Sequence, residues 1–227
     1  MAEASARVLR AVEAAGIRTG ERRSERLARL TPAERKLYRW ILRTFAAGQK
    51  PEVETLCDVA SGLDIDVEEA MAKFAEEDLV HQDSSTGEIL VAYPFSGRAT
   101  AHRVRLGVDR EVDAMCAVDA LGMPYMLAAE AEIVSHDPLT GDEVWVRIDP
   151  GDGVWWEPQT AVVFAGATGA SGPSASTCCS FINFFASAKS AGRYLRENPV
   201  VRGETLSIPE AVEAGELIFG DLLEASV

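Results

Sequence analysis

Apolar residues recur at helical spacing in the part of the chain that follows residue 30. A capping box formed by Thr31 and Glu34 predicts that a helix begins here and extends over residues 32–47. Similar but shorter patterns predict helices over residues 51–60 and 67–76. Three amphipathic helices are therefore expected in close succession.

The spacing of apolar residues then changes from helical to alternating. Residues 79–81 and 88–93 flank a polar turn, and this arrangement predicts a β-hairpin. Three helices followed by a hairpin resemble a winged helix, and a turn-rich stretch at residues 94–97 ends this winged-helix-like module, which we assign to residues 31–94. Residues 1–30 are predicted to form an N-terminal helix or arm with little core of its own.

Residues 95–227 show both alternating and helical patterns, and we find no internal repeat. In chain order the patterns predict a strand at 101–106, a helix at 113–122, a hairpin of 131–136 with 144–148, a strand at 161–164, a flexible loop of small residues at 166–177, a strand at 181–185, and helices at 187–197 and 207–223. The expected fold class is α+β, with the three-helix module followed by an α+β domain that contains antiparallel hairpins.

The composition is acidic. The 227 residues include 36 Asp and Glu against 22 Lys and Arg, which gives a net charge of -14. Such a surface repels phosphate backbones, and the predicted helix over residues 67–76 is itself acidic, so nucleic-acid binding is not expected. The module is instead expected to cover the rest of the chain.

The sequence has the features of a cytoplasmic protein. No stretch approaches the ~18 consecutive apolar residues that a membrane span needs, and the first residues mix Glu and Arg where a secretion signal needs an apolar run. No membrane partner is therefore expected. The four cysteines, Cys57, Cys116, Cys178 and Cys179, should be thiols in a reducing compartment.

Two cysteine motifs stand out as candidate chemistry. Cys116 and Asp119 are three residues apart on a predicted helix, so both side chains would project from one face. A buried cysteine often serves only as a small apolar residue, which is the simpler interpretation of Cys116 alone. The adjacent Cys178 and Cys179 are harder to place in one core face, so at least one of them is expected to meet a ligand or substrate.

These motifs carry a family resemblance. The segments Met115-Cys116-Ala117-Val118-Asp119, Thr177-Cys178-Cys179 and Phe184-Phe185-Ala186-Ser187, in this order and spacing, resemble organomercurial (alkylmercury) lyases. The resemblance covers most of the chain from about Thr31. It implies that residues 95–227 form the catalytic domain, that Cys116, Asp119 and Cys178 cleave the carbon–mercury bond, and that Cys179 is dispensable.

The chain departs from the family pattern at two positions. Asp137 stands where some members have a cysteine that the chemistry does not require, and Ser180 follows the adjacent cysteines where members have histidine. The first departure leaves the implied activity unchanged, whereas the second bears on rate and substrate range.

The chemistry of mercury agrees with these residue types. Mercury is a soft cation that prefers thiolate to carboxylate, so Cys116 and Cys178 would hold it while Asp119 relays a proton to the departing carbon. Mercury would be substrate and product, and no organic cofactor is expected. The Hg(II) product is expected to pass to cellular thiols or to a mercuric reductase.

The same residues allow three other interpretations. A structural zinc site would need about four Cys or His ligands at short spacings, which the chain lacks. A cysteine hydrolase could pair Cys116 with His102 or His136. A thiol-based metal-binding or sensing regulator would use the winged helix to bind DNA, but the acidic helix opposes this and leaves Asp119 without a role.

Overall fold

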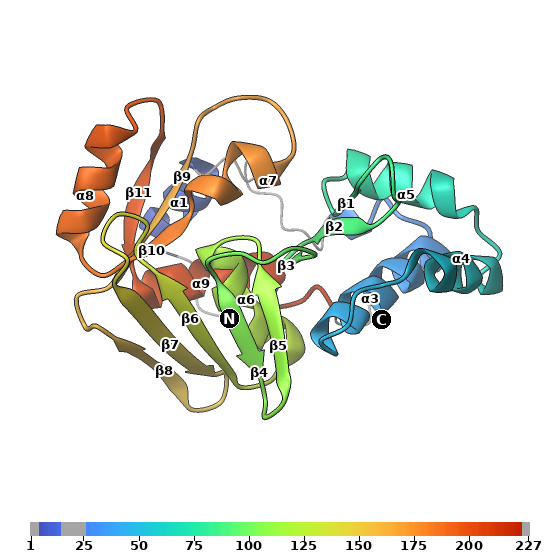
Figure 1. Ribbon diagram of the computed structural model, residues 1–227, viewed down its shortest axis with the longest axis horizontal. Coiled ribbons are helices and arrows are strands. Elements are labelled where there is room, and N and C mark those ends of the chain that lie inside the picture. Colours follow the sequence, from blue (N-terminus) through green and yellow to red (C-terminus); the bar gives the residue numbers. More distant parts are fainter. Residues whose placement is uncertain (1–4, 15–25, 224–227) are drawn as a thin grey trace.

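The computed structural model describes residues 5–14 and 26–223 of the chain. Its helical part lies at one end of the long axis in Figure 1 and contains α3 (Pro32–Ala46), α4 (Val53–Gly62) and α5 (Val67–Glu76). All three helices predicted in this part are confirmed, and only α4 begins and ends slightly later than predicted.

Side-chain hydrogen bonds mark where these helices begin. The Thr31 hydroxyl accepts a hydrogen bond from the backbone N–H of Glu34 at 3.2 Å, and the Glu34 carboxylate accepts one from the N–H of Thr31 at 2.5 Å. At the start of α5 the Asp66 carboxylate accepts from the N–H of Glu69 at 2.9 Å. Each bond satisfies a backbone donor that a helix leaves unpaired in its first turn.

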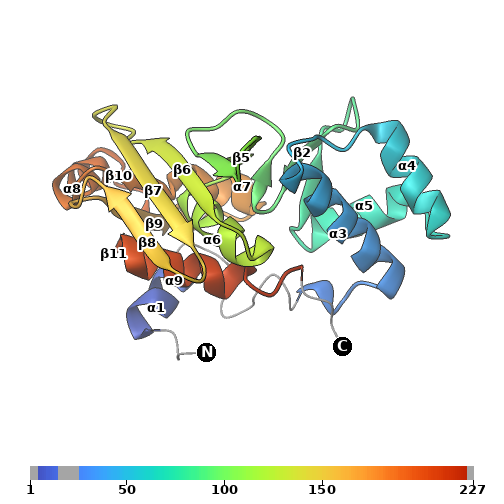
Figure 2. The same cartoon turned by 90° about the horizontal axis from the view of Figure 1, so that it is seen from below.

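An antiparallel sheet of eight strands connects the helical part to the rest of the molecule (Figure 1). Its strands lie in the order β1-β2-β3-β5-β4-β6-β7-β8. Their bounds are β1 (Val80–Gln82), β2 (Ile89–Ala92), β3 (Phe95–Ser96), β4 (Arg103–Leu106), β5 (Arg110–Ala114), β6 (Ala131–His136), β7 (Glu143–Asp149) and β8 (Gly153–Glu157). Figure 2 shows β6, β7 and β8 side by side on one side of the molecule. Both predicted hairpins are confirmed, as β1 with β2 and β6 with β7.

The short strand β3 joins the two parts of the chain. Phe95 pairs with Ala92 of β2 on one side and with Ala114 of β5 on the other. Its ring also stacks on that of Phe45 in α3, with centroids 5.6 Å apart. The sheet therefore continues without a break past residues 94 and 95.

A second, three-stranded sheet is formed late in the chain. Its strands lie in the order β10-β9-β11, with β9 (Val162–Ala167) between β10 (Asn183–Phe185) and β11 (Arg202–Ser207). The helix α8 (Ala188–Glu197) follows β10, as predicted. Neither β11 nor the strands β3, β5 and β8 of the larger sheet was predicted, and β3 lies in the stretch at residues 94–97 that was predicted as a turn-rich boundary.

The predicted loop over residues 166–177 is wrong at both ends. Gly166 and Ala167 extend β9 by pairing with β11, and α7 (Ser174–Thr177) forms a short helix before the cysteines. Glycine on both strands permits this close pairing: a Cβ atom at Gly166 would lie 2.8 Å from the carbonyl oxygen of Arg202, and one at Gly203 of β11 would lie 2.1 Å from that of Ala165. Residues too small to fill a core thus allow the backbones of β9 and β11 to approach each other closely.

The predicted helix over residues 113–122 is also wrong at its start. Asp113 and Ala114 belong to β5, and Cys116 has an extended backbone and is the N-cap of α6 (Ala117–Leu127). The helix begins after Cys116 because the preceding residues are held by the sheet, where Asp113 pairs with Arg103. Cys116 and Asp119 consequently meet at a helix end rather than on a helix face.

The helix α6 is almost completely buried and packs against α9 (Ile208–Phe219). The two backbones touch, since a Cβ atom at Gly122 would lie 2.8 Å from the carbonyl oxygen of Gly215 and 2.5 Å from the Phe219 ring. This crossing holds the N-terminal end of α6 in a fixed place. Among the described residues, no helix is both long and apolar enough to span a membrane.

The N-terminal segment contributes more to the core than predicted. The helix α1 (Ala6–Ala14) packs against β9, β11 and α9, and its residues Val8 and Ala11 are fully buried. The Arg7 guanidinium also donates to the carbonyl of Thr205 at 2.6 Å. The helix of the expected helix or arm is therefore confirmed as α1, and only the expectation of little core is wrong for it. Residues 1–4 and 15–25 lie outside the described part of the chain.

Candidate functional site

Cys116 is placed by the junction between β5 and α6. Its thiol sulfur accepts a hydrogen bond from the backbone N–H of Asp119 at 3.5 Å, as an N-cap side chain does. The next residue, Ala117, donates its N–H to the carbonyl of Ile182 at 3.1 Å, which ties this helix end to the segment after the adjacent cysteines. The two cysteine motifs are thus joined through the backbone.

Asp119 lies in the first turn of α6. Its carboxylate is 3% exposed, although carboxylates are rarely buried in proteins. The N-terminal end of a helix carries a partial positive charge that favours an anion, and this offsets part of the cost of burial. One carboxylate oxygen lies 3.8 Å from the thiol sulfur of Cys179.

The adjacent cysteines lie between two short helical segments. Cys178 ends α7, and Cys179 begins a 3-10 turn, η1 (Cys179–Phe181). Their side chains diverge: the Cys178 thiol donates to the carbonyl of Ser174 at 3.3 Å, and the Cys179 thiol points to Asp119. Both cysteines are buried, although at least one of them was expected to meet a ligand or substrate.

One cluster of potential metal ligands results from this arrangement. Among the described residues, the ligand atoms of Cys116, Asp119 and Cys179 all lie within 4.8 Å of one another. The Cys178 sulfur is not one of these atoms, but its thiol contacts that of Cys179. The structure thus brings Cys116 and Asp119 together with Cys179. Cys178, the other cysteine predicted to react, lies outside this cluster and contacts it through Cys179.

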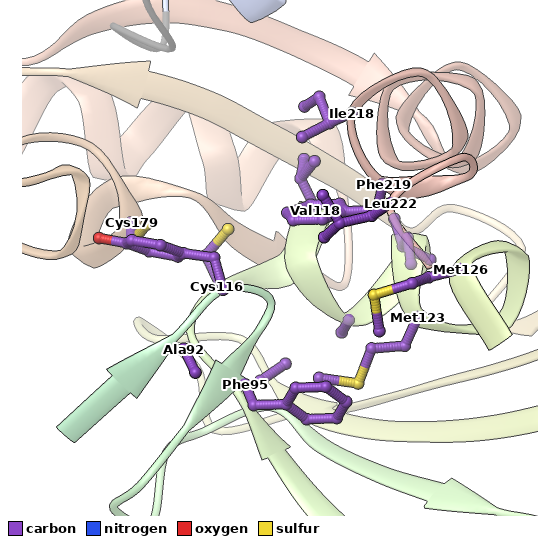
Figure 3. Close-up of a cluster of buried hydrophobic side chains, with 14 of the residues drawn as sticks. Ala92, Phe95, Cys116, Val118, Met123, Met126, Cys179, Ile218, Phe219 and Leu222 are labelled. Atoms are coloured by element: carbon purple, nitrogen blue, oxygen red, sulfur yellow. The ribbon is translucent and has the colours of Figure 1, made fainter. Parts of the chain in front are cut away.

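The surroundings of the cluster are apolar. Figure 3 shows Cys116 and Cys179 beside buried hydrophobic side chains, which include Phe95, Val118 and Met123. These side chains come from β3 and α6, and each is at most 2% exposed. A group that binds at the thiols is therefore surrounded by hydrocarbon and sulfur.

Burial keeps the thiols protonated. It is the main reason why the pKa of Cys116 is raised to about 11; the charge of Asp119 also raises it, whereas hydrogen bonding with Cys179 lowers it. Hydrogen bonds with the Cys116 and Cys178 thiols, together with burial, raise the pKa of Cys179 well above its ordinary range. At neutral pH these cysteines carry their protons, and coordination of a soft cation is what would release them.

The histidines do not join this cluster. His102 is buried, its Nδ1 lies 2.9 Å from the Ser135 hydroxyl, and burial lowers its pKa to about 4. His136 is exposed at the end of β6. Within the described part of the chain, the group around Cys116 contains no histidine, so neither the hydrolase pair nor a zinc site gains support.

The two departures from the family pattern have different surroundings. Asp137 is 1% exposed and accepts hydrogen bonds from the N–H groups of Leu139 at 2.9 Å and Ala186 at 3.0 Å, so it links the β6–β7 turn to the end of β10. Ser180 is exposed, and its hydroxyl donates to the carbonyl of Ala175 at 2.9 Å. Asp137 thus has a structural contact, whereas Ser180 lies at the surface and bonds the backbone of α7.

No sequence pattern indicated the residues that hold α7. Asp78 and Tyr93, both from the helical part and its hairpin, hydrogen-bond the first turn of α7. Asp78 follows α5 with a left-handed backbone, φ 53°. An aspartate in this conformation is uncommon enough to mark a special position, but the conformation is visible only in the structure.

Comparison with known proteins relates this chain to alkylmercury lyases. The model of the alkylmercury lyase family matches residues 95–220. The alkylmercury lyase of Streptomyces lividans is 26% identical over 187 residues, which are 82% of this chain and 83% of that protein. That of Bacillus cereus is 25% identical over 182 residues, 80% of each chain, and that of Staphylococcus epidermidis is 28% identical over 179 residues, 79% of each. In fold, the chain is similar to the crystal structure of the mercury-bound form of MerB2, with a TM-score of 0.72 and 20% identity over 97% of this chain and 100% of that one.

Proposed function

This chain belongs to the alkylmercury lyase family, and from that premise we propose how its residues cleave the carbon–mercury bond of an organomercurial. Cys116 and Cys178 bind mercury, and Asp119 delivers a proton to the carbon. The observation that carries the proposal is the buried cluster in which the ligand atoms of Cys116, Asp119 and Cys179 lie within 4.8 Å of one another, with the Cys178 thiol in contact with that of Cys179. Thiolates are the protein ligands that a soft cation prefers, and a carboxylate is a poor ligand for it but a competent acid.

The first step is capture of the substrate R–Hg–X. The sulfur of Cys116 forms a bond to mercury, X departs as its anion, and the thiol proton leaves with it as HX. Although the pKa of Cys116 is raised to about 11, bonding to the metal removes the proton because a coordinated thiol ionises far more easily. The apolar side chains around the cluster, such as Phe95 and Met123, then lie beside the organic group.

The second step breaks the carbon–mercury bond. Asp119 takes the proton of the second thiol, Cys178, and passes it to the carbon, whose bonding electrons to mercury form the new carbon–hydrogen bond. The products are the hydrocarbon R–H and Hg(II) held by two thiolates, so mercury is neither oxidised nor reduced. In total, R–Hg–X and two thiols give R–H, HX and a bis-thiolate Hg(II) site.

Cys179 contributes to the surroundings of this chemistry. Its thiol contacts those of Cys116 and Cys178 and lies 3.8 Å from Asp119, so it lies beside the groups that react without being one of the two mercury ligands. In this proposal it is dispensable, because two thiolates satisfy mercury, which favours low coordination numbers with sulfur.

The Hg(II) product and the cellular setting complete the proposal. Hg(II) leaves by exchange to cellular thiols or to a mercuric reductase, and the reaction needs no organic cofactor. The four free cysteines suit a reducing cytoplasm, which would keep the reactive thiols reduced.

We also propose that residues 31–94 form a winged-helix-like module that covers the catalytic part, residues 95–227, rather than binding DNA. The last of its three helices, α5, and its caps carry five carboxylates, at Asp66, Glu68, Glu69, Glu76 and Glu77. Its one cation, Lys73, is paired with Glu34 at 3.1 Å. This charge disfavours contact with phosphates and so disfavours a DNA-binding regulator.

The direct test is product analysis. The reduced protein is incubated with methylmercury or phenylmercury and excess small thiol, and the headspace is analysed for methane or benzene. We expect the amount of hydrocarbon to increase with the protein concentration and to correspond to many turnovers per protein molecule. Stoichiometric binding of the organomercurial with the organic group retained would contradict the proposed function and indicate a thiol trap instead.

A further inference from the structure

The short helix α7 is held in place by residues from the other part of the chain. The Asp78 carboxylate accepts hydrogen bonds from the backbone N–H of Ser174, at 3.3 and 3.4 Å to its two oxygens, and from the Ser174 hydroxyl. The Tyr93 hydroxyl accepts from the N–H of Ala175 at 2.6 Å. The helical part and its hairpin thus fix the first turn of α7.

Asp78 is itself held from two sides. The Arg26 guanidinium, which is buried, lies 3.4 Å from one carboxylate oxygen, and Nε2 of His81 lies 2.7 Å from the other. With its backbone in the left-handed region, the carboxylate projects from the end of α5 toward α7. The contacts with Arg26 and His81 therefore hold the carboxylate in place independently of Ser174.

The same hydrogen-bonded path continues to the thiols. The carbonyl of Ser174 accepts both the backbone N–H of Cys178, at 3.0 Å, and the Cys178 thiol, at 3.3 Å. The Cys178 thiol contacts that of Cys179, which faces Asp119. A shift of Ser174 therefore moves both cysteines of the pair relative to Cys116.

We propose that Asp78 is a positioning residue of the reaction: through Ser174 it sets where α7 holds the adjacent cysteines relative to Cys116 and Asp119. The inference rests on the proposed function and adds a residue 96 positions away from Ser174. Misplacement of reacting groups by about 1 Å can cost on the order of 10²-fold in rate. Asp78 touches neither substrate nor product in this scheme, so it acts only through α7.

The test is the variant Asp78→Asn. Asparagine has the same shape and tolerates the left-handed backbone, but its amide N–H₂ opposes the two donors of Ser174. We expect kcat for methylmercury cleavage to fall about 10- to 100-fold, with KM nearly unchanged because Cys116 still captures mercury. Alkylation of the native protein by iodoacetamide, followed by mass spectrometry, should become faster at Cys178 and Cys179 but not at Cys116.

Asp83 supplies a matched control. Its carboxylate also accepts from one serine's backbone N–H and hydroxyl, those of Ser85, and also faces an arginine, Arg98 at 3.8 Å. It lies in the β1–β2 turn together with Ser85, while Arg98 follows β3, so neither partner belongs to α7. Asp83→Asn should keep the parent's kcat and the parent's labelling at the adjacent cysteines, with exposed Cys57 as the internal standard for labelling.

A second pair of variants serves if Asp78→Asn does not fold. Ser174→Ala removes one hydrogen bond to Asp78 and should lower kcat in the same direction, whereas Ser174→Thr keeps the hydroxyl and should restore it. Parent-like kcat and labelling in Asp78→Asn, or equal losses in Asp78→Asn and Asp83→Asn, would overturn the inference. A parent protein that releases no hydrocarbon would overturn the proposed function instead, and the labelling pattern would still decide whether Asp78 places α7.

Discussion

The Cys179 thiol and the Asp119 carboxylate face each other across 60 positions of the chain, with Sγ 3.8 Å from Oδ2 and both groups buried. The contact brings the second cysteine motif against the first turn of α6. It also raises a specific question, because the family pattern assigns the chemistry to Cys178, whose thiol donates to Ser174 instead. Substitution of each thiol separately answers it.

We expect Cys116→Ser and Cys178→Ser each to lose turnover by about 10²-fold or more, since a hydroxyl is a hard ligand that binds mercury poorly. Cys179→Ser should keep much of the parent's turnover. Hydrocarbon release from methylmercury measures all three, and Cys57→Ser on the exposed face of α4 is the control. An inactive Cys179→Ser beside an active Cys178→Ser would show that Cys179, the neighbour of Asp119, is the second thiolate.

Asp119→Ala should separate binding from cleavage. If Asp119 relays the proton, organomercurial still binds to Cys116, while cleavage falls by roughly 10²- to 10⁴-fold, the range typical of losing a general acid. Mass spectrometry should detect an adduct that retains the organic group. Glu34→Gln, which alters the carboxylate at the same position of α3, is the control and should cleave at the parent's rate. Equal single-turnover release from Asp119→Ala and the parent would mean that the proton comes directly from a thiol or from water.

The buried thiols should make stability fall at high pH. The pKa of Cys116 is about 11 in the folded protein against an ordinary value of 9.0, so between these values the unfolded chain binds fewer protons than the folded one. The free energy of unfolding then decreases as pH rises, by about 1.4 kcal/mol per unit and roughly 3 kcal/mol by pH 11. Below pH 9 this contribution is complete and does not change.

Urea unfolding at pH 8 and pH 10.5, in the presence of a reductant, measures this dependence. Cys116→Ala should show a visibly smaller loss of stability over this interval than the parent does. Cys57→Ala, at an exposed position, should follow the parent. A parent-like loss in Cys116→Ala would show that Cys116 is not the group responsible.

Deletion of residues 1–94 should give an insoluble or inactive remainder. The deletion removes the β2 partner of β3 and the Phe45 ring that stacks on Phe95, and it removes Val8 and Ala11 from the core around α9. Solubility and hydrocarbon release measure the result. A soluble, fully active fragment would show that residues 1–94 are an independent domain, and a gel-shift assay with the full chain at moderate salt would then be the test of DNA binding.

Much of the local structure follows from the sequence by itself. The capping boxes at Thr31 and Ser207, the helices that they begin, and the alternating hairpins were predictable because the interactions that specify them span only a few residues. The Cys116 and Asp119 pair was equally visible, since residues three apart are close in either a helix or its cap. The soft-ligand chemistry follows from residue type alone.

The tertiary structure decided what depends on contacts between distant residues. Strand β11 forms because the distant strand β9 pairs with it. Strands β5 and β8 instead pair with their chain neighbours β4 and β7 across short turns, and this pairing places Asp113 in a sheet rather than a helix. Burial, which raises the pKa of Cys116, and the placement of Cys179 beside Asp119 arise only when α6, α7 and the helical part are packed together. Asp78 carries no local signal of its contact with Ser174, because hydrogen bonds between groups 96 positions apart are set by the whole fold and not by the residues around either end.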